Sequence, residues 1–233
     1  NIYFFKSGGG NHLYIIETPL KKYLARINFY PLKNEWKIKE HEFLVLKMIE
    51  HLKIAPKAYY LDASAKGLEQ HFIITDFIEG EPIKSIEQKH IKDLAEVLRK
   101  LHTEITFSKS GNSLPPNDPL PYQFGIFDEF ANGEDKQIEK YSNWTGIEKI
   151  THQFKKMRGL LKDSVNQFKY FERCTKFSLC HADLKLENIL ATEKGVCLID
   201  WECAGSDVPE SDLGRLFSGA KFTEEFEKNF LAY

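Results

Sequence analysis

Two short motifs near the C-terminal end of this sequence constrain its fold more than any other feature. The first reads His181-Ala-Asp-Leu-Lys-Leu-Glu-Asn188, and the second is an apolar run that ends in an acidic residue, Leu198-Ile-Asp200. A short hairpin is predicted between them, because the polar turn Thr192-Glu-Lys-Gly195 separates two apolar runs. Such a hairpin brings the end of the first motif close to the end of the second.

The side chains of these two motifs are those that phosphoryl transfer needs. A carboxylate, Asp183, can orient an attacking hydroxyl group and accept its proton. An amide, Asn188, and a second carboxylate, Asp200, offer the hard oxygen ligands that Mg²⁺ prefers. We therefore predict Asp183 as the base and the other two residues as magnesium ligands. The alternative is a polar hairpin that carries these residues by chance.

The paired motif resembles that of the aminoglycoside phosphotransferase and choline kinase family, which is related to the protein kinases. Members of that family have His-Gly-Asp-x-x-x-x-Asn followed by Ile-Asp-Trp-Glu or Ile-Asp-Phe-Glu. This sequence has Ala182 where Gly is common, and it continues from Asp200 with Trp201-Glu202. The resemblance implies an α+β, two-lobed protein-kinase-like fold. We expect residues 1–78 to form a nucleotide-binding N-lobe, a small antiparallel sheet with one helix. Residues 79–233 are expected to form a mainly helical C-lobe with the catalytic and acceptor-binding residues.

A glycine-rich turn, Ser7-Gly-Gly-Gly-Asn-His12, separates two expected strands at residues 2–6 and 13–17. Glycine lets a backbone approach a ligand closely and point its N–H groups at phosphate oxygens. The turn is neither a Walker A loop nor Gly-x-Gly-x-x-Gly, so by itself it is equally compatible with a plain hairpin. The resemblance implies that Gly9, Gly10 and Asn11 cover the nucleotide phosphates.

A cationic residue, Arg26, lies in the middle of the next expected strand, residues 23–29. A charge in that position is either exposed or paired. The resemblance implies that Arg26 holds the α- and β-phosphates, and that a Glu of the following helix, expected over residues 36–53, pairs with it. The spacing to Pro56 favours Glu42 as that partner, with Glu40 as the alternative.

The hinge between the lobes is expected after two strands at residues 57–62 and 71–76, where the sequence reads Phe77-Ile-Glu-Gly-Glu-Pro82. In the family, adenine hydrogen-bonds to the hinge backbone. The resemblance therefore implies that the carbonyl of Asp76 and the amide of Ile78 bind adenine. Residues 85–105 then predict an amphipathic helix. Ser85 is its expected N-cap, and His102 is expected to pack rather than to catalyse.

The resemblance also implies roles for residues around the base. His181 is expected to fix the catalytic loop, because the first residue of this motif points toward the strand of the metal ligand in kinases. Lys185 occupies the place where protein kinases often have a Lys near the γ-phosphate. Asp212, in a later Asp-Leu pair, is expected to cap a helix or brace the loop.

The acceptor site is predicted in the segment that precedes the catalytic loop. In the family, this segment helps to bind the acceptor. Aromatic residues with acids can hold a cation such as an amino sugar or a quaternary amine, and the alternative is helix packing with solvated acids. The candidates in that segment are Tyr122, Phe124, Phe127, Asp128, Glu129, Glu134, Asp135, Tyr141 and Trp144, and further along the chain Glu202 and Asp207.

Charge and composition restrict the partners. The formal net charge of −2 gives no indication of nucleic acid binding. No apolar run approaches the roughly 18 residues of a membrane span, and no signal peptide is visible, so a cytoplasmic location without membrane contact is expected. The 4 cysteines match neither a zinc pattern nor a disulfide scaffold. Because the chain begins at Asn1 and ends in a helical pattern, we expect an excerpt or a processed form.

We therefore predict a kinase that transfers the γ-phosphate of ATP, or alternatively of GTP, with Mg²⁺ to a hydroxyl group of a small molecule. A nucleotide-binding pseudokinase scaffold and a protein kinase are the alternatives. A scaffold has no need to keep all three oxygen donors. A protein kinase needs an activation segment after Asp200, and the remaining chain is too short to hold one. The sequence does not indicate the oligomeric state.

Overall fold

The computed structural model describes residues 1–8, 10–29, 38–64, 70–85, 87–108, 152, 156, 176–219, 228 and 230–232. The chain divides into two compact units, Asn1–Thr106 with Ser178–Tyr233, and Phe107–Phe177. The first unit contains both motifs. The acceptor candidates at residues 122–144 lie outside the described residues. The expected lobe boundary at residue 78 falls inside the first unit and stays a prediction.

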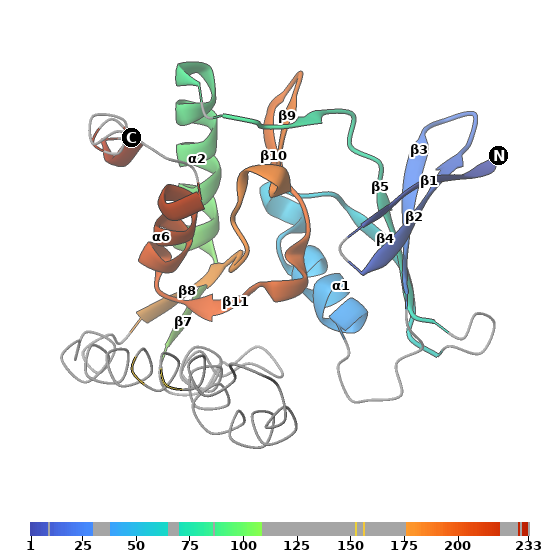
Figure 1. Cartoon of the computed structure of the whole chain (residues 1–233), viewed down its shortest axis with the longest axis horizontal. Coiled ribbons are helices and arrows are strands. Elements are labelled where there is room, and N and C mark those ends of the chain that lie inside the picture. The colour runs from blue at the N-terminus through green and yellow to red at the C-terminus, as the bar shows by residue number, and fades with distance from the viewer. Residues whose placement is uncertain are drawn as a thin grey trace. The chain divides into compact units, whose positions relative to one another are not determined.

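The first unit begins with a five-stranded antiparallel sheet, which Figure 1 shows in blue and blue-green. The strands lie in the order β1-β2-β3-β5-β4. Their bounds are Ile2–Gly8 for β1, Asn11–Glu17 for β2, Lys22–Asn28 for β3, Ala58–Asp62 for β4 and Phe72–Asp76 for β5. The expected strands are therefore present within one or two residues at each end, as β-branched and aromatic residues favour.

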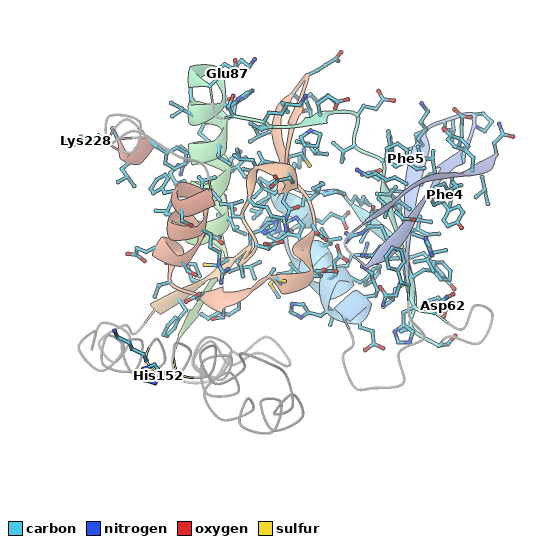
Figure 2. All side chains as sticks on the ribbon, in the orientation of Figure 1. Phe4, Phe5, Asp62, Glu87, His152 and Lys228 are labelled. Atoms are coloured by element: carbon cyan, nitrogen blue, oxygen red, sulfur yellow. The ribbon has the colours of Figure 1, made fainter. Side chains whose placement is uncertain are left out.

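The register of this sheet places Arg26 in its central strand. On β3, Arg26 lies opposite Leu13 of β2 and Ile73 of β5. The strand β1 is at the edge, and all of its residues are exposed, among them Phe4 and Phe5, which Figure 2 labels. The backbone of Arg26 is therefore held on both sides, because β3 is hydrogen-bonded to β2 and to β5.

The helix of the sheet region, α1, spans Ile38–Met48 and contacts β4 and β5. It buries Val45 and Leu46, whereas Leu44 is exposed. It ends before the expected residue 53, because the chain continues as a short 3-10 helix, η1 (Glu50–Leu52), and then turns at Lys53, whose φ is 58°. The left-handed Lys53 ends η1, because a residue in this conformation cannot continue a right-handed helix.

The remaining described elements include the hairpin that joins the two motifs, with the strands and helices that follow the five-stranded sheet in the sequence. The short strand β6 (Glu81–Pro82) pairs with β9 (Ile189–Thr192), which pairs with β10 (Gly195–Leu198). A second three-stranded sheet has the order β11-β8-β7, from Gly205–Asp207, Lys176–Cys180 and Thr106–Ser108. The helices are α2 (Gln88–Glu104) and α6 (Pro209–Gly219). None of the helices within the described ranges has the length and apolarity of a membrane span.

The start of α2 differs from the expectation. Glu87, which Figure 2 labels at one end of this helix, occupies the N-cap position in place of Ser85. The main-chain amide of Glu87 donates to Nδ1 of His90 (3.3 Å), as in a capping box with His at the third position. The Ser85 prediction was wrong because this pairing starts the helix two residues later. The buried face of α2 contains Ile91, Leu94, Leu98 and Leu101.

Candidate active site

The two sequence motifs meet at one hairpin. A 3-10 turn, η2 (Leu186–Asn188), leads into β9, and β10 returns from the turn to Leu198. The amide of Ile199 then donates to the carbonyl of Asn188 (2.9 Å), which continues the pairing past the ends of both strands. This hydrogen bond places Asn188 directly across from the residue that precedes Asp200.

Asp183 is held by two of its neighbours. The side-chain amide of Asn188 donates to the carbonyl of Asp183 (2.9 Å) and to its Oδ2 (3.0 Å). The ammonium of Lys185 also donates to Oδ2 (2.6 Å), and this hydrogen bond raises the pKa of Lys185. The Asp183 side chain keeps a third of its surface exposed. Its carboxylate is therefore fixed in orientation and still accessible to a hydroxyl group.

His181 is a buried, neutral ring that connects the two motifs. Its Nδ1 accepts from the amide of Asp183 (3.3 Å), so its Nε2 carries the proton and donates to the carbonyl of Ile199 (2.9 Å). Burial lowers the pKa of His181, which agrees with this tautomer. The ring also packs on Trp201, with 4.6 Å between ring centroids. The structure thus places His181 as a support of the loop.

Asp212 braces the same loop from α6. Its Oδ2 accepts from the amide of His181 (2.8 Å) and from Nε2 of His102 (3.0 Å), and its Oδ1 accepts from the amide of Ala182 (2.9 Å). Burial by itself raises the pKa of a carboxyl group, but these donors offset it and the pKa of Asp212 is lowered. Ala182 has a φ of 61°, the left-handed region that favours glycine. The common Gly at this position is explained by that backbone conformation.

Arg26 connects the sheet to the second motif. One guanidinium nitrogen donates to Oε1 of Glu42, and another donates to Oδ1 of Asp200 (2.6 Å). Burial opposes the charge of Arg26, but the two carboxylates more than offset it, so its pKa is raised. Burial likewise opposes the charge of Glu42, yet Arg26 and Lys39 lower its pKa. Of the two candidate partners, Glu42 is therefore the residue that pairs with Arg26.

The oxygen donors of the site fit a magnesium ion. The Asn188 amide nitrogen is occupied by Asp183, which leaves its side-chain oxygen as the atom available to a cation. Asp200 uses Oδ1 for Arg26 and keeps 28% of its side chain exposed. The φ of Asp200 is 69°, and the 3-10 turn η3 (Trp201–Cys203) follows it directly. An amide oxygen and a carboxylate are the hard donor set that Mg²⁺ prefers.

The structure describes only some of the residues predicted to bind the nucleotide. Gly10 has a φ of 81° and lies at the turn between β1 and β2, beside the buried Asn11, while Gly9 lies outside the described residues. Asp76 ends β5, and its carboxylate accepts from Lys21 (2.8 Å). Among the described residues, no hydrogen bond is found for the amide of Ile78. The roles of these residues stay predictions.

Two acidic residues that were expected near a cationic acceptor have other partners. Glu202 lies 3.6 Å from the ammonium of Lys39, and burial, followed by the charge of Asp200, raises its pKa. Asp207 is buried at the end of β11, and its Oδ1 accepts from the amide of the next residue, Val208 (2.8 Å). Sequence spacing could not reveal the Glu202 contact, because the fold brings Lys39 and Glu202 together from distant parts of the sequence.

The buried group of His102, Cys180 and Asp212 has ligand atoms within 4.8 Å of one another, but it is not suited to a metal. Both Asp212 oxygens already accept hydrogen bonds, and the Cys180 thiol donates to the carbonyl of Val208 (3.4 Å). Burial raises the pKa of this thiol above its usual range, so it stays protonated. Of the described cysteines, Cys180 is buried, and Cys197 and Cys203 are half-buried.

The phosphotransferase enzyme family (APH) model matches residues 2–233, so the chain belongs to that family. The predicted family and the predicted kinase-like α+β fold are confirmed. Membership of this family makes the chain a phosphotransferase enzyme. No curated protein matches the chain.

Three solved structures illustrate the likeness. Choline kinase LicA from Streptococcus pneumoniae has a TM-score of 0.68 and 21% identity, with 100% of this chain and 74% of that chain covered. Plasmodium vivax ethanolamine kinase has a TM-score of 0.74 and 18% identity, with 99% and 66% covered. Spectinomycin phosphotransferase, solved with ADP and spectinomycin, has a TM-score of 0.53 and 18% identity, with 98% and 72% covered. At these identities the likeness concerns the fold.

Proposed function

We propose that this protein transfers the γ-phosphate of ATP to a hydroxyl group of a small molecule. The observation that carries the proposal is the arrangement of Asp183, Asn188 and Asp200 on one hairpin. The base is oriented by Asn188 (3.0 Å), and Asp200 is held by Arg26 (2.6 Å). A scaffold protein does not need this combination of an exposed carboxylate and two oriented oxygen donors.

In this proposal Asp183 accepts a hydrogen bond from the acceptor hydroxyl and takes its proton as the oxygen attacks the γ-phosphorus. Lys185, which donates to the same carboxylate (2.6 Å), balances its charge and lies where it can also contact a transferred phosphoryl group. His181 and Asp212 hold the loop, and neither of them contacts the substrate. Arg26 carries the positive charge that faces the phosphates, because its side chain reaches from the central strand toward Asp200.

Asn188 and Asp200 are the residues that would hold Mg²⁺, which supplies positive charge to the phosphate oxygens when it is bound. The nucleotide itself is proposed from the family and from the ADP complex of spectinomycin phosphotransferase. ATP is the preferred donor in this proposal, and GTP is the alternative. The hinge residues Asp76 and Ile78 and the glycine turn at Gly9, Gly10 and Asn11 complete the proposed nucleotide site.

The acceptor is proposed to carry a positively charged nitrogen. Choline, ethanolamine and spectinomycin are the compounds named for the similar enzymes, and each has a hydroxyl group and a nitrogen that is cationic at neutral pH. A carboxylate-rich site attracts such cations, and Asp183 and Asp200 both keep part of their surface exposed.

A release assay for ADP tests the proposed function. The purified protein is given Mg²⁺ and ATP with choline, ethanolamine or spectinomycin in turn. Turnover that depends on one acceptor is expected. Asp183→Asn should lower its kcat by about a hundredfold while ADP binding changes little, since the base does not hold the nucleotide. Activity of Asp183→Asn within a few-fold of the wild type would contradict the assignment of the base.

A further inference from the structure

A buried lysine on α1 lies beside the residues assigned to the active site, and the proposed function gives it no role. Lys39 and Glu42 are both 0% exposed at their side chains, and the Lys39 ammonium donates to Oε2 of Glu42 (3.1 Å). The same ammonium lies 3.6 Å from a carboxylate oxygen of Glu202. Lys39 therefore bridges a helix of the sheet region and the turn that directly follows Asp200.

Together with the Arg26 contacts, this bridge closes a ring of alternating charges. Arg26 joins Asp200 to Glu42, and Lys39 joins Glu42 to Glu202. The chain itself closes the ring, because Glu202 belongs to the 3-10 turn η3 that begins next to Asp200. His41 strengthens the same link, as its Nε2 lies 2.6 Å from the carbonyl of Ala204, at the end of this turn.

A buried ammonium is costly unless its carboxylate partners are well placed, so a lysine in this position needs a reason. An apolar side chain would fill the space without that cost. It would leave Arg26 as the sole cation of the ring, shared by three carboxylates, and Glu202 would repel Asp200. Lys39 satisfies Glu42 and Glu202, which leaves the second guanidinium nitrogen of Arg26 to hold Asp200 in one orientation.

We propose that Lys39 is a positioning residue that fixes the metal-ligand carboxylate of Asp200 through Glu42 and Glu202. This inference rests on the proposed function, since it assumes that Asp200 binds magnesium. In this proposal Lys39 contacts neither the nucleotide nor the metal, but it determines the affinity of the site for the metal.

The same helix offers a matched control. Lys47 also pairs with a glutamate three positions further on, Glu50 (3.2 Å), but the Lys47 side chain is 40% exposed and Glu50 is 32% exposed. An exposed pair of this kind contributes little to stability or function. Lys39→Met and Lys47→Met therefore remove the same ammonium group from the same helix, but only Lys39→Met disrupts the ring of charges.

The first measurement compares the binding of ADP with Mg²⁺ and with EDTA by calorimetry. For the wild type, Mg²⁺ should tighten ADP binding. In Lys39→Met this preference for Mg²⁺ should fall about tenfold, as is usual when a residue that orients a metal ligand is removed. Binding in EDTA should stay the same, Lys39→Arg should keep most of the preference, and Lys47→Met should match the wild type.

The second measurement uses no ligand. Urea unfolding of Lys39→Met, Glu202→Gln and the double variant in EDTA forms a thermodynamic cycle. Lys39→Met should destabilise the protein less when Glu202 is already replaced by Gln. The two effects on the unfolding constant should depart from additivity by about threefold or more. If Lys39→Met does not fold, the double variant, which lacks the unpaired carboxylate, replaces it in the calorimetry.

The outcomes separate the two proposals. A wild type that binds ADP equally well with Mg²⁺ and with EDTA contradicts the proposed function. A wild-type preference for Mg²⁺ that Lys39→Met leaves unchanged overturns only the role of Lys39. Additive effects of Lys39→Met and Glu202→Gln on unfolding also overturn it, because the ring would then not couple these residues.

Discussion

At the scale of single residues, the catalytic loop depends on backbone conformations that most side chains avoid. Ala182 and Asp200 both have positive φ, 61° and 69°, on either side of the hairpin. A side chain with a Cβ atom is strained in this region, and the strain is maintained by surrounding contacts. For Ala182 those contacts are the hydrogen bonds that the loop amides donate to Asp212.

Substitution of Ala182 tests this strain. Ala182→Gly should leave the free energy of unfolding unchanged or raise it by up to about 1 kcal/mol, because glycine adopts the left-handed region freely. Ala182→Val should lower it by more than about 1 kcal/mol, because a β-branched residue fits this region poorly. Urea titrations of both variants check the prediction. Equal stability of the Gly and Val variants would contradict the positive φ.

The neutral state of His181 predicts a pH dependence. Burial lowers its pKa from the ordinary value of about 6.5, so below that pH the unfolded chain binds a proton that the folded protein excludes. This contribution to stability is complete above about pH 6.5 and is lost as the pH falls toward the folded pKa. Between pH 7.5 and 5.5 it accounts for at most about 1.4 kcal/mol.

Urea unfolding at those two pH values measures this effect. His181→Asn, which cannot titrate there, should be less stable than the wild type at both, but the difference should shrink at the lower pH. A difference that stays constant between pH 7.5 and 5.5 would mean that folding does not lower the pKa of His181.

At the scale of elements, helices from separate parts of the sequence meet at the catalytic loop. His102 near the end of α2 and Asp212 in α6 form one hydrogen bond, and Asp212 also receives two loop amides. Sequence analysis assigned both residues a structural role. It could not predict their hydrogen bond, because the two residues lie 110 positions apart and helix periodicity identifies only which face of each helix is buried.

The brace at Asp212 should cost more to remove than its histidine partner. Asp212→Ala leaves two buried loop amides without an acceptor, each worth about 1–3 kcal/mol, whereas His102→Phe leaves both amides bonded. We expect Asp212→Ala to lower the free energy of unfolding and kcat well beyond His102→Phe. Denaturant midpoints and ADP release of the two variants provide the comparison. A larger loss of stability and kcat in His102→Phe than in Asp212→Ala would show that the loop amides do not need Asp212 as their acceptor.

The strands and helices show what the sequence can and cannot predict. Alternation and turn residues located the strands of the five-stranded sheet within one or two residues, and the two motifs located the hairpin. The end of α1 was placed too late, because the change from the α-helix to the 3-10 helix η1 carries no sequence signal of its own. Lys39 was not identified, because its spacing to Glu42 equals that of the exposed pair Lys47 and Glu50. Only burial in the fold distinguishes these lysines.

At the scale of the whole molecule, the family and the fold follow from the sequence, but the acceptor does not. The two motifs contain the chemistry that the family shares, so they identify the reaction class. Acceptor selectivity depends on other parts of the chain. Of the acids expected there, Glu202 pairs with Lys39, Asp207 accepts from the neighbouring amide of Val208, and the candidates at residues 122–144 lie outside the described structure. A charge preference must therefore be measured with intact acceptors.

Choline and its neutral analogue 3,3-dimethyl-1-butanol form a matched pair of acceptors, since they differ in charge and hardly in shape. If the acceptor site recognises a cation, kcat/KM should be higher for choline by about tenfold, because charge attraction and aromatic contacts together contribute on the order of 1–2 kcal/mol. Added salt should reduce this ratio if the attraction involves exposed carboxylates. Ethanolamine against 1-propanol extends the test to a primary amine. Equal values within both pairs, with turnover still present, would remove the cationic acceptor and leave the kinase assignment intact.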